Sequence, residues 1–338
     1  MGDPRHGHRA STCALLATLL LVLGAACSDG DAGDDAGTTT ASTAAGEADA
    51  GGTFTVLTYN VAGLPQEISE VTPAEDIPLI SPLLADHDVV LTQEDFDWWV
   101  PGGLADGLDF NQYHERLRAE AGFEHATPVH PGPEAAGVDL ADRPEMAIGD
   151  GIGIMSRFPL SGFEVEAWDD CFGGFTEGAS DCLAMKGFRV ATMDLGGGAE
   201  VDVYSLHGEA GGTEQDQALQ PEDFAQLAAF IAEHSEGRAV VVGGDTNLHI
   251  DDHEDAGDGA DAEIWADFLA ETGLTDTCAA TDCDDPGIID KIAVRSGGDV
   301  ELTTEAWESP ADRFTDAAGE PLSDHDPVVA TLRWRPSA

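Results

Sequence analysis

Short apolar runs alternate with amphipathic stretches from residue 53 to the end of the chain. Three amphipathic stretches predict helices, at Phe110–Ala121, Pro221–His234 and Ala262–Thr272. The apolar runs are mostly rich in β-branched residues and have the length of strands, which predicts a single α/β domain. The predicted strands are Thr53–Tyr59, Asp88–Thr92, Gly151–Met155, Gly187–Leu195, Glu200–Ser205, Ala239–Gly243, Ile288–Val294 and Pro327–Trp334.

The predicted helix Pro221–His234 has a regular apolar face. Phe224, Leu227, Phe230 and Ile231 recur at helical spacing. Pro221 suits the first turn of a helix, because an N–H at that position would have no partner within the helix. We find no internal repeat and no second linker in this part of the chain, so we expect one domain over residues 53–338.

The first 52 residues have a different composition. An apolar run, Cys13–Ala26, follows two arginines and has the length of a signal-peptide core. It ends in Leu-Gly-Ala-Ala-Cys27, which resembles a bacterial lipobox. We therefore expect residues 1–27 to be a signal peptide with lipidation at Cys27, and the protein to be exported and anchored to the cell envelope. Ordinary secretion is the alternative. Residues 28–52 are acidic without a large apolar side chain, which predicts a disordered linker.

The charge of the chain restricts its partners. The formal net charge is −52, from 14 Lys and Arg against 66 Asp and Glu. Broad binding to nucleic acid needs a basic surface, so nucleic acid is the less expected partner. Apolar residues make up 42% of the chain, which is enough for a sizeable core and excludes a fully disordered protein.

Four cysteines remain after the predicted signal peptide. An even number of cysteines in an exported chain suggests disulfides. Proximity in sequence favours Cys171–Cys182 and Cys278–Cys283, although four cysteines allow three pairings. A metal site is the alternative, but neither pair has the CxxC spacing.

Uncommon polar side chains stand at the ends of the predicted strands, where ligands collect in α/β folds. Taken singly, each could cap a turn or lie on a rim. Together, their carboxylate and amide oxygens and two imidazoles suit Mg²⁺ or another hard divalent cation. The sequence lacks a Gly-x-Ser-x-Gly or Cys–His signature, so metal-assisted attack by water is favoured. The residues are Asn60, Glu94, His207, Asp245, Asn247, Asp290, Asp324 and His325.

Six segments around these residues resemble, in order, the endonuclease/exonuclease/phosphatase superfamily. The resemblance covers about residues 53–335 and implies a four-layer α/β/β/α sandwich with two packed mixed β-sheets and a site at one edge of the sheets. The segments are Leu57-Thr-Tyr-Asn60-Val, Gln93-Glu94, Gly151-Ile-Gly-Ile-Met-Ser156-Arg157-Phe-Pro159-Leu, Ser205-Leu-His207, Gly244-Asp245-Thr-Asn247 and Ser323-Asp324-His325-Asp326-Pro327-Val.

The resemblance also implies a role for each residue. Glu94 would be the main metal ligand, with Asn60 close to the metal and Asp324 supporting the metal or the phosphate. A cation beside a phosphodiester stabilises the charge that the transition state concentrates on the non-bridging oxygens.

The resemblance implies catalytic roles for five further residues. His325 would be the general base, with Asp290 fixing its tautomer. Asp245 and Asn247 would orient the attacking water and the phosphate. His207 would donate to a phosphate oxygen or assist the leaving group. His207 and Asn247 would therefore also bind substrate.

Two segments resemble the secreted neutral sphingomyelinase and phospholipase C branch. They are Cys171–Phe188, with its Lys-Gly pair, and Gln93-Glu-Asp-Phe96. This implies a monomeric phosphodiesterase that meets phospholipid at a membrane surface and releases phosphocholine from sphingomyelin or phosphatidylcholine. An exported nuclease of the same fold and a non-catalytic envelope lipoprotein are the alternatives. The aromatic side chains that could contact a membrane or anchor the core are Trp98, Trp99, Phe172, Phe175 and Trp307.

The acidic segment Asp251–Asp261 could bind Ca²⁺. It lacks the full EF-hand pattern, so a solvated loop is the favoured interpretation.

Overall fold

The computed structural model describes residues 51–249 and 260–337. Two six-stranded mixed sheets pack face to face, which confirms the sandwich expected from the sequence. The first sheet has the order β11-β12-β1-β2-β4-β3 and the second the order β5-β6-β7-β8-β10-β9. The strands of the first sheet are β1 (Gly52–Asn60), β2 (Val89–Gln93), β3 (His125–Ala126), β4 (Gly153–Ser156), β11 (Val300–Glu308) and β12 (Val328–Pro336). Those of the second are β5 (Leu160–Ala167), β6 (Gly187–Gly196), β7 (Ala199–His207), β8 (Ala239–Asp245), β9 (Thr275–Asp276) and β10 (Asp290–Arg295).

The main core lies between the two sheets. Alternate residues of β1, such as Phe54 and Val56, face the second sheet and are fully buried. Their partners include Val203 of β7 and Val241 of β8. These central strands are rich in β-branched and other apolar residues, which is why they were predictable from the sequence.

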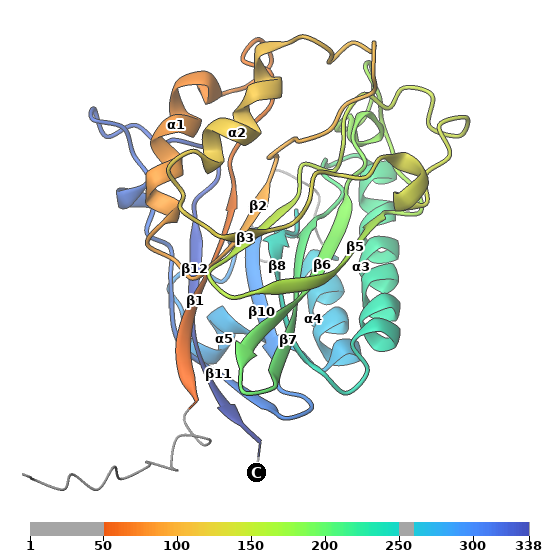
Figure 1. The fold of residues 1–338 in the computed structure, drawn as a ribbon. Coiled ribbons are helices and arrows are strands. Elements are labelled where there is room, and N and C mark those ends of the chain that lie inside the picture. The colour runs from red at the N-terminus through yellow and green to blue at the C-terminus, as the bar shows by residue number, and fades with distance from the viewer. Residues whose placement is uncertain (1–50, 250–259, 338) are drawn as a thin grey trace, which may run out of the picture. The chain divides into compact units, whose positions relative to one another are not determined.

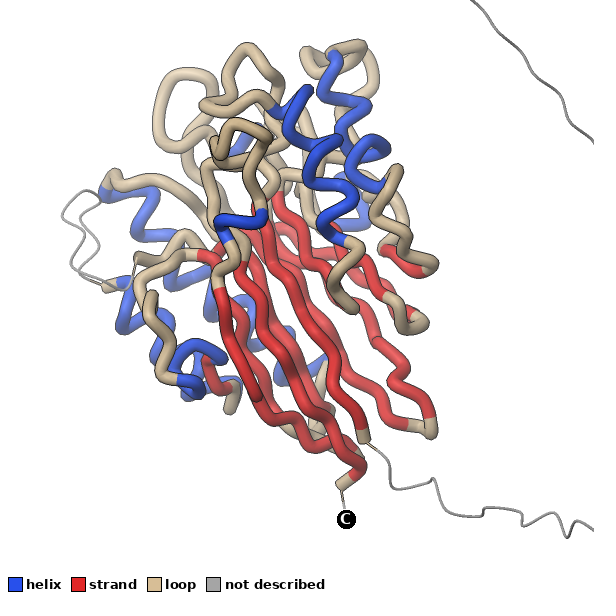
Figure 2. Tube along the Cα trace, turned by 90° about the vertical axis from the view of Figure 1, so that its left-hand side faces the viewer, coloured by secondary structure: helices blue, strands red, loops and turns tan. Residues whose placement is uncertain are grey.

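Helices cover the outer faces of both sheets and complete the four layers (Figure 1). Helices α1 (Pro73–Leu84) and α2 (Tyr113–Arg118) pack on the first sheet through an apolar cluster that includes Leu57 and Ile80. Helices α3 (Glu214–His234) and α4 (Asp261–Thr272) pack on the second sheet. Helix α5 is a short segment, Thr277–Thr281. Figure 2 shows strands side by side, with helices above them and to their left.

Helix α3 starts earlier than the sequence pattern predicted. The predicted start at Pro221 is wrong, because Pro221 lies inside the helix. Thr213 caps the helix: its hydroxyl accepts from the Asp216 backbone N–H, and the Asp216 carboxylate accepts from the Thr213 backbone N–H. This reciprocal pair stabilises a first turn that proline alone would not specify.

The sequence patterns did not predict several helices and strands, for physical reasons. Helix α1 contains Pro78 and Pro82, which normally end helices. Strands β5 and β11 lie at sheet edges and alternate glutamates with apolar residues, so they lack a continuous apolar run. The predicted helix Phe110–Ala121 is a 3₁₀ turn that leads into the short helix α2.

Both predicted disulfides are present, Cys171–Cys182 and Cys278–Cys283. The predicted signal peptide, Cys27 and nearly all of the predicted linker lie outside the described residues, and so does most of the acidic segment Asp251–Asp261. Asp261 itself begins α4 and accepts a hydrogen bond from the His249 backbone N–H. Among the residues that the structure describes, no helix is both long enough and apolar enough to cross a bilayer.

Candidate active site

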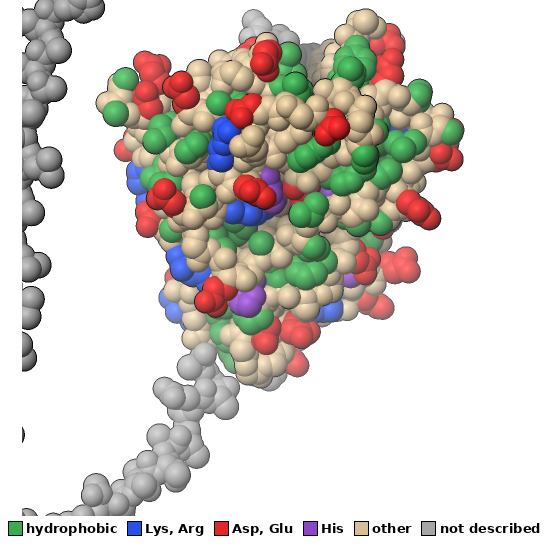
Figure 3. Space-filling model, turned by 45° about the horizontal axis from the view of Figure 1, so that its top comes forward, with side chains coloured by type: hydrophobic (Ala, Val, Ile, Leu, Met, Phe, Trp, Pro, Cys, Tyr) green, Lys and Arg blue, Asp and Glu red, His purple; other side chains and the backbone are tan. Residues whose placement is uncertain are grey.

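One edge of the sandwich gathers the polar strand ends. Strands β1 and β2 run parallel, as do β7 and β8, so Asn60, His207 and Asp245 come to the same edge. Strand β10 runs antiparallel to β8, which places Asp290 opposite Asp245. These strand ends lie below a cleft of about 530 Å³. Figure 3 shows this end of the molecule, with histidine side chains near the centre of the face and hydrophobic side chains gathered beside them.

Buried polar contacts hold the two sheets together beneath the cleft. The Gln93 amide donates to the Ser205 hydroxyl at 3.1 Å, and the Thr58 hydroxyl donates to Gln93 at 3.3 Å. Gly244 allows β8 to approach β7, because a Cβ atom there would collide with the carbonyl oxygen of Leu206. The segment before β12 is tied to β1 by the Ser323 hydroxyl, which donates to the Asn60 carbonyl at 2.7 Å.

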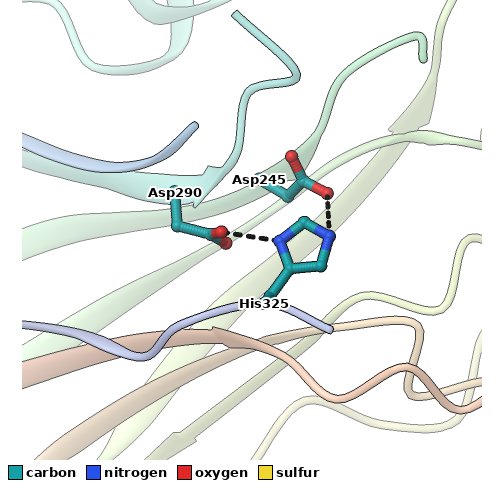
Figure 4. Close-up of side chains that lie close together, drawn as sticks. All are labelled: Asp245, Asp290 and His325. Atoms are coloured by element: carbon teal, nitrogen blue, oxygen red, sulfur yellow. Dashed lines mark hydrogen bonds and ion pairs between the residues drawn. The ribbon is translucent and has the colours of Figure 1, made fainter. Parts of the chain in front are cut away.

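His325 lies between two carboxylates (Figure 4). Its Nδ1 is 2.7 Å from Oδ2 of Asp290, and its Nε2 is 3.7 Å from Oδ2 of Asp245. Burial alone would lower the pKa of His325, but Asp290 and Asp245 hold that pKa well above its usual range. Because Nδ1 is already engaged by Asp290, Nε2 is the atom that remains for chemistry.

Asp245 is the common partner of both site histidines. Its Oδ2 also lies 3.3 Å from Nε2 of His207. Burial alone would raise the pKa of Asp245, but His325 and His207 outweigh burial and hold the pKa far below its usual range. Asp245 is therefore a carboxylate at any pH at which the protein would be assayed.

Asn60 connects the two carboxylates of the cleft. Its Nδ2 donates to Oδ2 of Asp245 at 3.0 Å and to Oε1 of Glu94 at 3.2 Å, and it is 3.4 Å from Nε2 of His325. Its Oδ1 accepts from the backbone N–H of Ala62 at 3.0 Å, which determines the orientation of the amide. In this orientation the Asn60 amide donates to both carboxylates and holds them close together.

Two of the site residues have an unusual backbone conformation. Glu94, directly after β2, has φ +55°, and Asn247, after β8, has φ +52°. Such conformations cost free energy and occur most often at functional sites. The turn at Asn247 is held by its own backbone N–H, which donates to Asp245, and by its side-chain amide, which donates to the Gly208 carbonyl at 3.2 Å.

The structure brings together seven of the eight predicted residues. Asp324 differs from them: it is exposed, does not line the cleft, and its recorded hydrogen bond is from the neighbouring Ser323 hydroxyl. The predicted role of Asp324 at the metal gains no support from this geometry. Among the described His, Cys, Asp and Glu side chains, Asp245, Asp290 and His325 have ligand atoms close enough together to hold one ion. A metal role for Glu94, Asn60 and Asp324 stays a prediction.

The donors of the cleft fit a hard divalent cation. The carboxylates of Glu94 and Asp245 converge on the same amide nitrogen of Asn60, so oxygen ligands of two negative side chains face one region of the cleft. Hard cations such as Mg²⁺ prefer this chemistry. Asp290 and His325 engage each other instead, in the manner of an oriented base.

Sequence reasoning missed an ion pair in the wall of the cleft. Lys186 pairs with Asp181 at 2.5 Å, and its Nζ donates to the Gly208 carbonyl at 3.3 Å. Burial alone would lower the pKa of Lys186, but Asp181 raises it, so the amine keeps its charge beside His207 and Asn247. The Lys-Gly pair at the start of β6 was the available signal for this residue.

A buried acid, Glu209, lies behind this ion pair. Burial, with Asp181 and Asp223 nearby, raises the pKa of Glu209 to about 9. The folded protein therefore holds a proton on Glu209 that the unfolded chain, with a pKa of 4.5, releases. Stability contributed at this site is lost as the pH rises from 4.5 towards 9, because the unfolded state alone gains the charge.

We expect Glu209→Gln to stabilise the fold more at pH 8 than at pH 5. Glutamine keeps the shape and cannot ionise, so it removes the penalty that grows with pH. Melting temperatures measured by circular dichroism at both pH values test this, with the exposed Glu301→Gln as the matched control. An equal effect of Glu209→Gln at both pH values would contradict the raised pKa.

The chain is similar to proteins of a known family. A family model for the endonuclease/exonuclease/phosphatase family matches residues 57–325. The chain belongs to this family. Among curated proteins, it is similar to the sphingomyelinases of Mycobacterium bovis and Mycobacterium tuberculosis, each 30% identical over 302 residues. The match covers 84% of this chain and 53% of those proteins, so the chain spans about half the length of the curated relatives that it matches.

Solved structures show the same endonuclease/exonuclease/phosphatase fold. Beta toxin from Staphylococcus aureus is 17% identical with a TM-score of 0.56, over 82% of this chain and 99% of that one. Sphingomyelinase C from Streptomyces griseocarneus is 20% identical with a TM-score of 0.54, over 82% and 99%. A further structure of the family fold, from Beutenbergia cavernae, is 20% identical with a TM-score of 0.55, over 83% and 72%.

Proposed function

We propose that this protein is an exported, metal-dependent phosphodiesterase that hydrolyses sphingomyelin or phosphatidylcholine and releases phosphocholine. The observation that carries the proposal is His325, held by Asp290 and facing Asp245 in a cleft whose other wall is apolar. The curated relatives named sphingomyelinase support the choice of a lipid substrate. The net charge of −52 makes long nucleic acid a poor alternative.

Different residues of the cleft have different roles in phosphodiester hydrolysis. Nε2 of His325 takes a proton from the attacking water, while Asp290 holds the imidazole in the required tautomer. The water oxygen bonds to phosphorus, and the bond from phosphorus to the lipid oxygen breaks. His207 and Asn247, which line the same cleft, are the residues that we assign to donate to phosphate oxygens or to assist the leaving alcohol.

Glu94 and Asp245 would hold a divalent cation, with Asn60 positioning both carboxylates. A bound Mg²⁺ supplies positive charge for the developing phosphate oxyanion. A beta toxin variant was solved with bound magnesium ions, which supports this choice of cation. A divalent cation held by Glu94 and Asp245 would offset the charge of Asp245, which is one of the two carboxylates that raise the pKa of His325.

Export and attachment belong to the same proposal. Two disulfides are consistent with an oxidising compartment outside the cytoplasm. Lipidation at Cys27 would hold the cleft near a membrane. Mass spectrometry of the mature N-terminus would show whether Cys27 carries acyl chains.

The decisive experiment offers the purified protein sphingomyelin vesicles, phosphatidylcholine vesicles and supercoiled plasmid, each with Mg²⁺ and with chelator. We expect phosphocholine from at least one lipid, loss of this release on chelation and its recovery when Mg²⁺ is restored. Nicked plasmid together with two intact lipids would establish the nuclease alternative. Turnover of none of the substrates would favour a binding protein.

A further inference from the structure

Exposed apolar side chains gather along the margin of the cleft. Ile68 is 67% exposed, Leu104 72%, Leu108 40% and Phe175 58%, and all four line the same cleft as His325. We call these four residues the apolar rim. They come from three segments far apart in sequence: the loop between β1 and α1, the loop after β2 and the loop closed by the first disulfide.

Much of the cleft below the rim is apolar. Leu64, Phe96, Phe110, Ile148 and Leu183 form this part of its lining. One surface therefore passes from exposed aliphatic side chains to the carboxylates and imidazoles of the site. A substrate with a polar phosphate and a long apolar part matches both ends at once.

The exposure of the rim is selective. Among the aromatic residues considered for membrane contact, Trp98, Trp99 and Trp307 pack against apolar clusters, whereas Phe175 is exposed. Single exposed apolar residues are common on proteins and need no explanation. Four that share the mouth of one cleft form a patch of the kind that marks an interaction surface.

The charge around the rim indicates which apolar surface it fits. The cleft lining contains one basic residue, Lys186, and Asp181 already pairs with it. The chain as a whole carries a net charge of −52, so an anionic surface would repel it. A zwitterionic bilayer has no net charge and therefore does not repel the protein.

We propose that the apolar rim inserts into the surface of a zwitterionic phospholipid bilayer and receives the apolar part of one lipid, so that its phosphate reaches Glu94 and His325. This rests on the proposed function and adds the binding surface for the substrate's apolar part. The cleft fits this occupant because apolar residues below the rim and the catalytic side chains line the same cavity.

The test compares a rim variant with a matched surface variant. Leu104→Ser combined with Leu108→Ser alters the rim. Val129→Ser combined with Leu140→Ser alters two exposed apolar residues that do not line the cleft. Each protein is assayed for flotation with phosphatidylcholine vesicles, for turnover of lipid in those vesicles, and for turnover of para-nitrophenyl phosphorylcholine, a soluble ester with the same headgroup. Melting temperatures verify that both variants are folded.

We expect the rim variant to lose at least about tenfold in flotation and in vesicle turnover, because each buried aliphatic side chain contributes to partitioning. Its turnover of the soluble ester stays unchanged, and the matched variant behaves as the parent does. Adding phosphatidylserine to the vesicles weakens flotation of the parent at low salt, and added salt restores it.

Three results would overturn the rim proposal. The rim variant could float and turn over lipid as the parent does. It could lose activity equally on vesicles and on the soluble ester. Light scattering could show a dimer that the rim substitutions convert to a monomer, which would identify a second copy of the chain as the occupant. Flotation does not depend on catalysis, so a parent that floats but hydrolyses neither substrate would contradict the proposed function and leave the rim proposal standing.

Discussion

His325→Ala is expected to lower turnover by about three orders of magnitude, since the proton acceptor and the group that positions the water are lost together. The structure leaves Nε2 of this imidazole as the available atom, because Asp290 engages Nδ1 at 2.7 Å. Steady-state release of phosphocholine from vesicles at saturating Mg²⁺ measures the effect. Turnover within about tenfold of the parent would rule out His325 as the base.

Two further variants test whether the loss of turnover is specific to His325. His125→Ala changes a half-buried histidine that does not line the cleft and should leave turnover unchanged. Asp290→Asn should lower turnover less than His325→Ala does, because asparagine fills the same space but no longer favours the charged imidazole. Added imidazole should restore part of the activity of His325→Ala and none of that of Asp290→Asn.

Glu94→Gln is expected to raise the Mg²⁺ concentration required for half-maximal activity by at least about tenfold, because it removes the charge of a proposed ligand. Glutamine retains an oxygen for the Asn60 amide to donate to, so the local hydrogen bond survives. Activity measured over a range of Mg²⁺ concentrations, together with calorimetric binding of Mg²⁺ to the free protein, tests this directly.

Asp324→Asn provides the contrast. The family resemblance implies a supporting role at the metal or the phosphate for Asp324, whereas the structure leaves this side chain exposed and outside the lining of the cleft. We therefore expect a much smaller change in Mg²⁺ requirement than for Glu94→Gln. A larger change in Asp324→Asn than in Glu94→Gln would indicate that Asp324, and not Glu94, binds the cation, and would contradict the proposed ligand set.

The fold was largely predictable because its central strands are buried on both faces. Strand β8 is apolar up to its final Asp245, and β1 and β7 carry closely spaced apolar side chains before they end in Asn60 and His207, a local pattern that can be recognised in the sequence. Helix α1 and the edge strands β5 and β11 have weaker local patterns, since their residues are balanced between a buried and an exposed face or include proline.

The sequence by itself predicted an α/β fold and the polar residues at its strand ends, because burial and local chain direction leave patterns in neighbouring residues. Proximity in sequence favoured the two disulfide pairings, and the family resemblance implied the two-sheet sandwich. Only the tertiary structure decided the orientation of Asn60, the exposure of Asp324 and the pairing of Lys186 with Asp181 beside His207. It also decided that Ile68, Leu104 and Phe175 share one cleft. These features depend on which loops lie side by side at the edge of the two packed sheets. Strand order and long-range packing decide which loops these are, and neither leaves a periodic pattern along the chain.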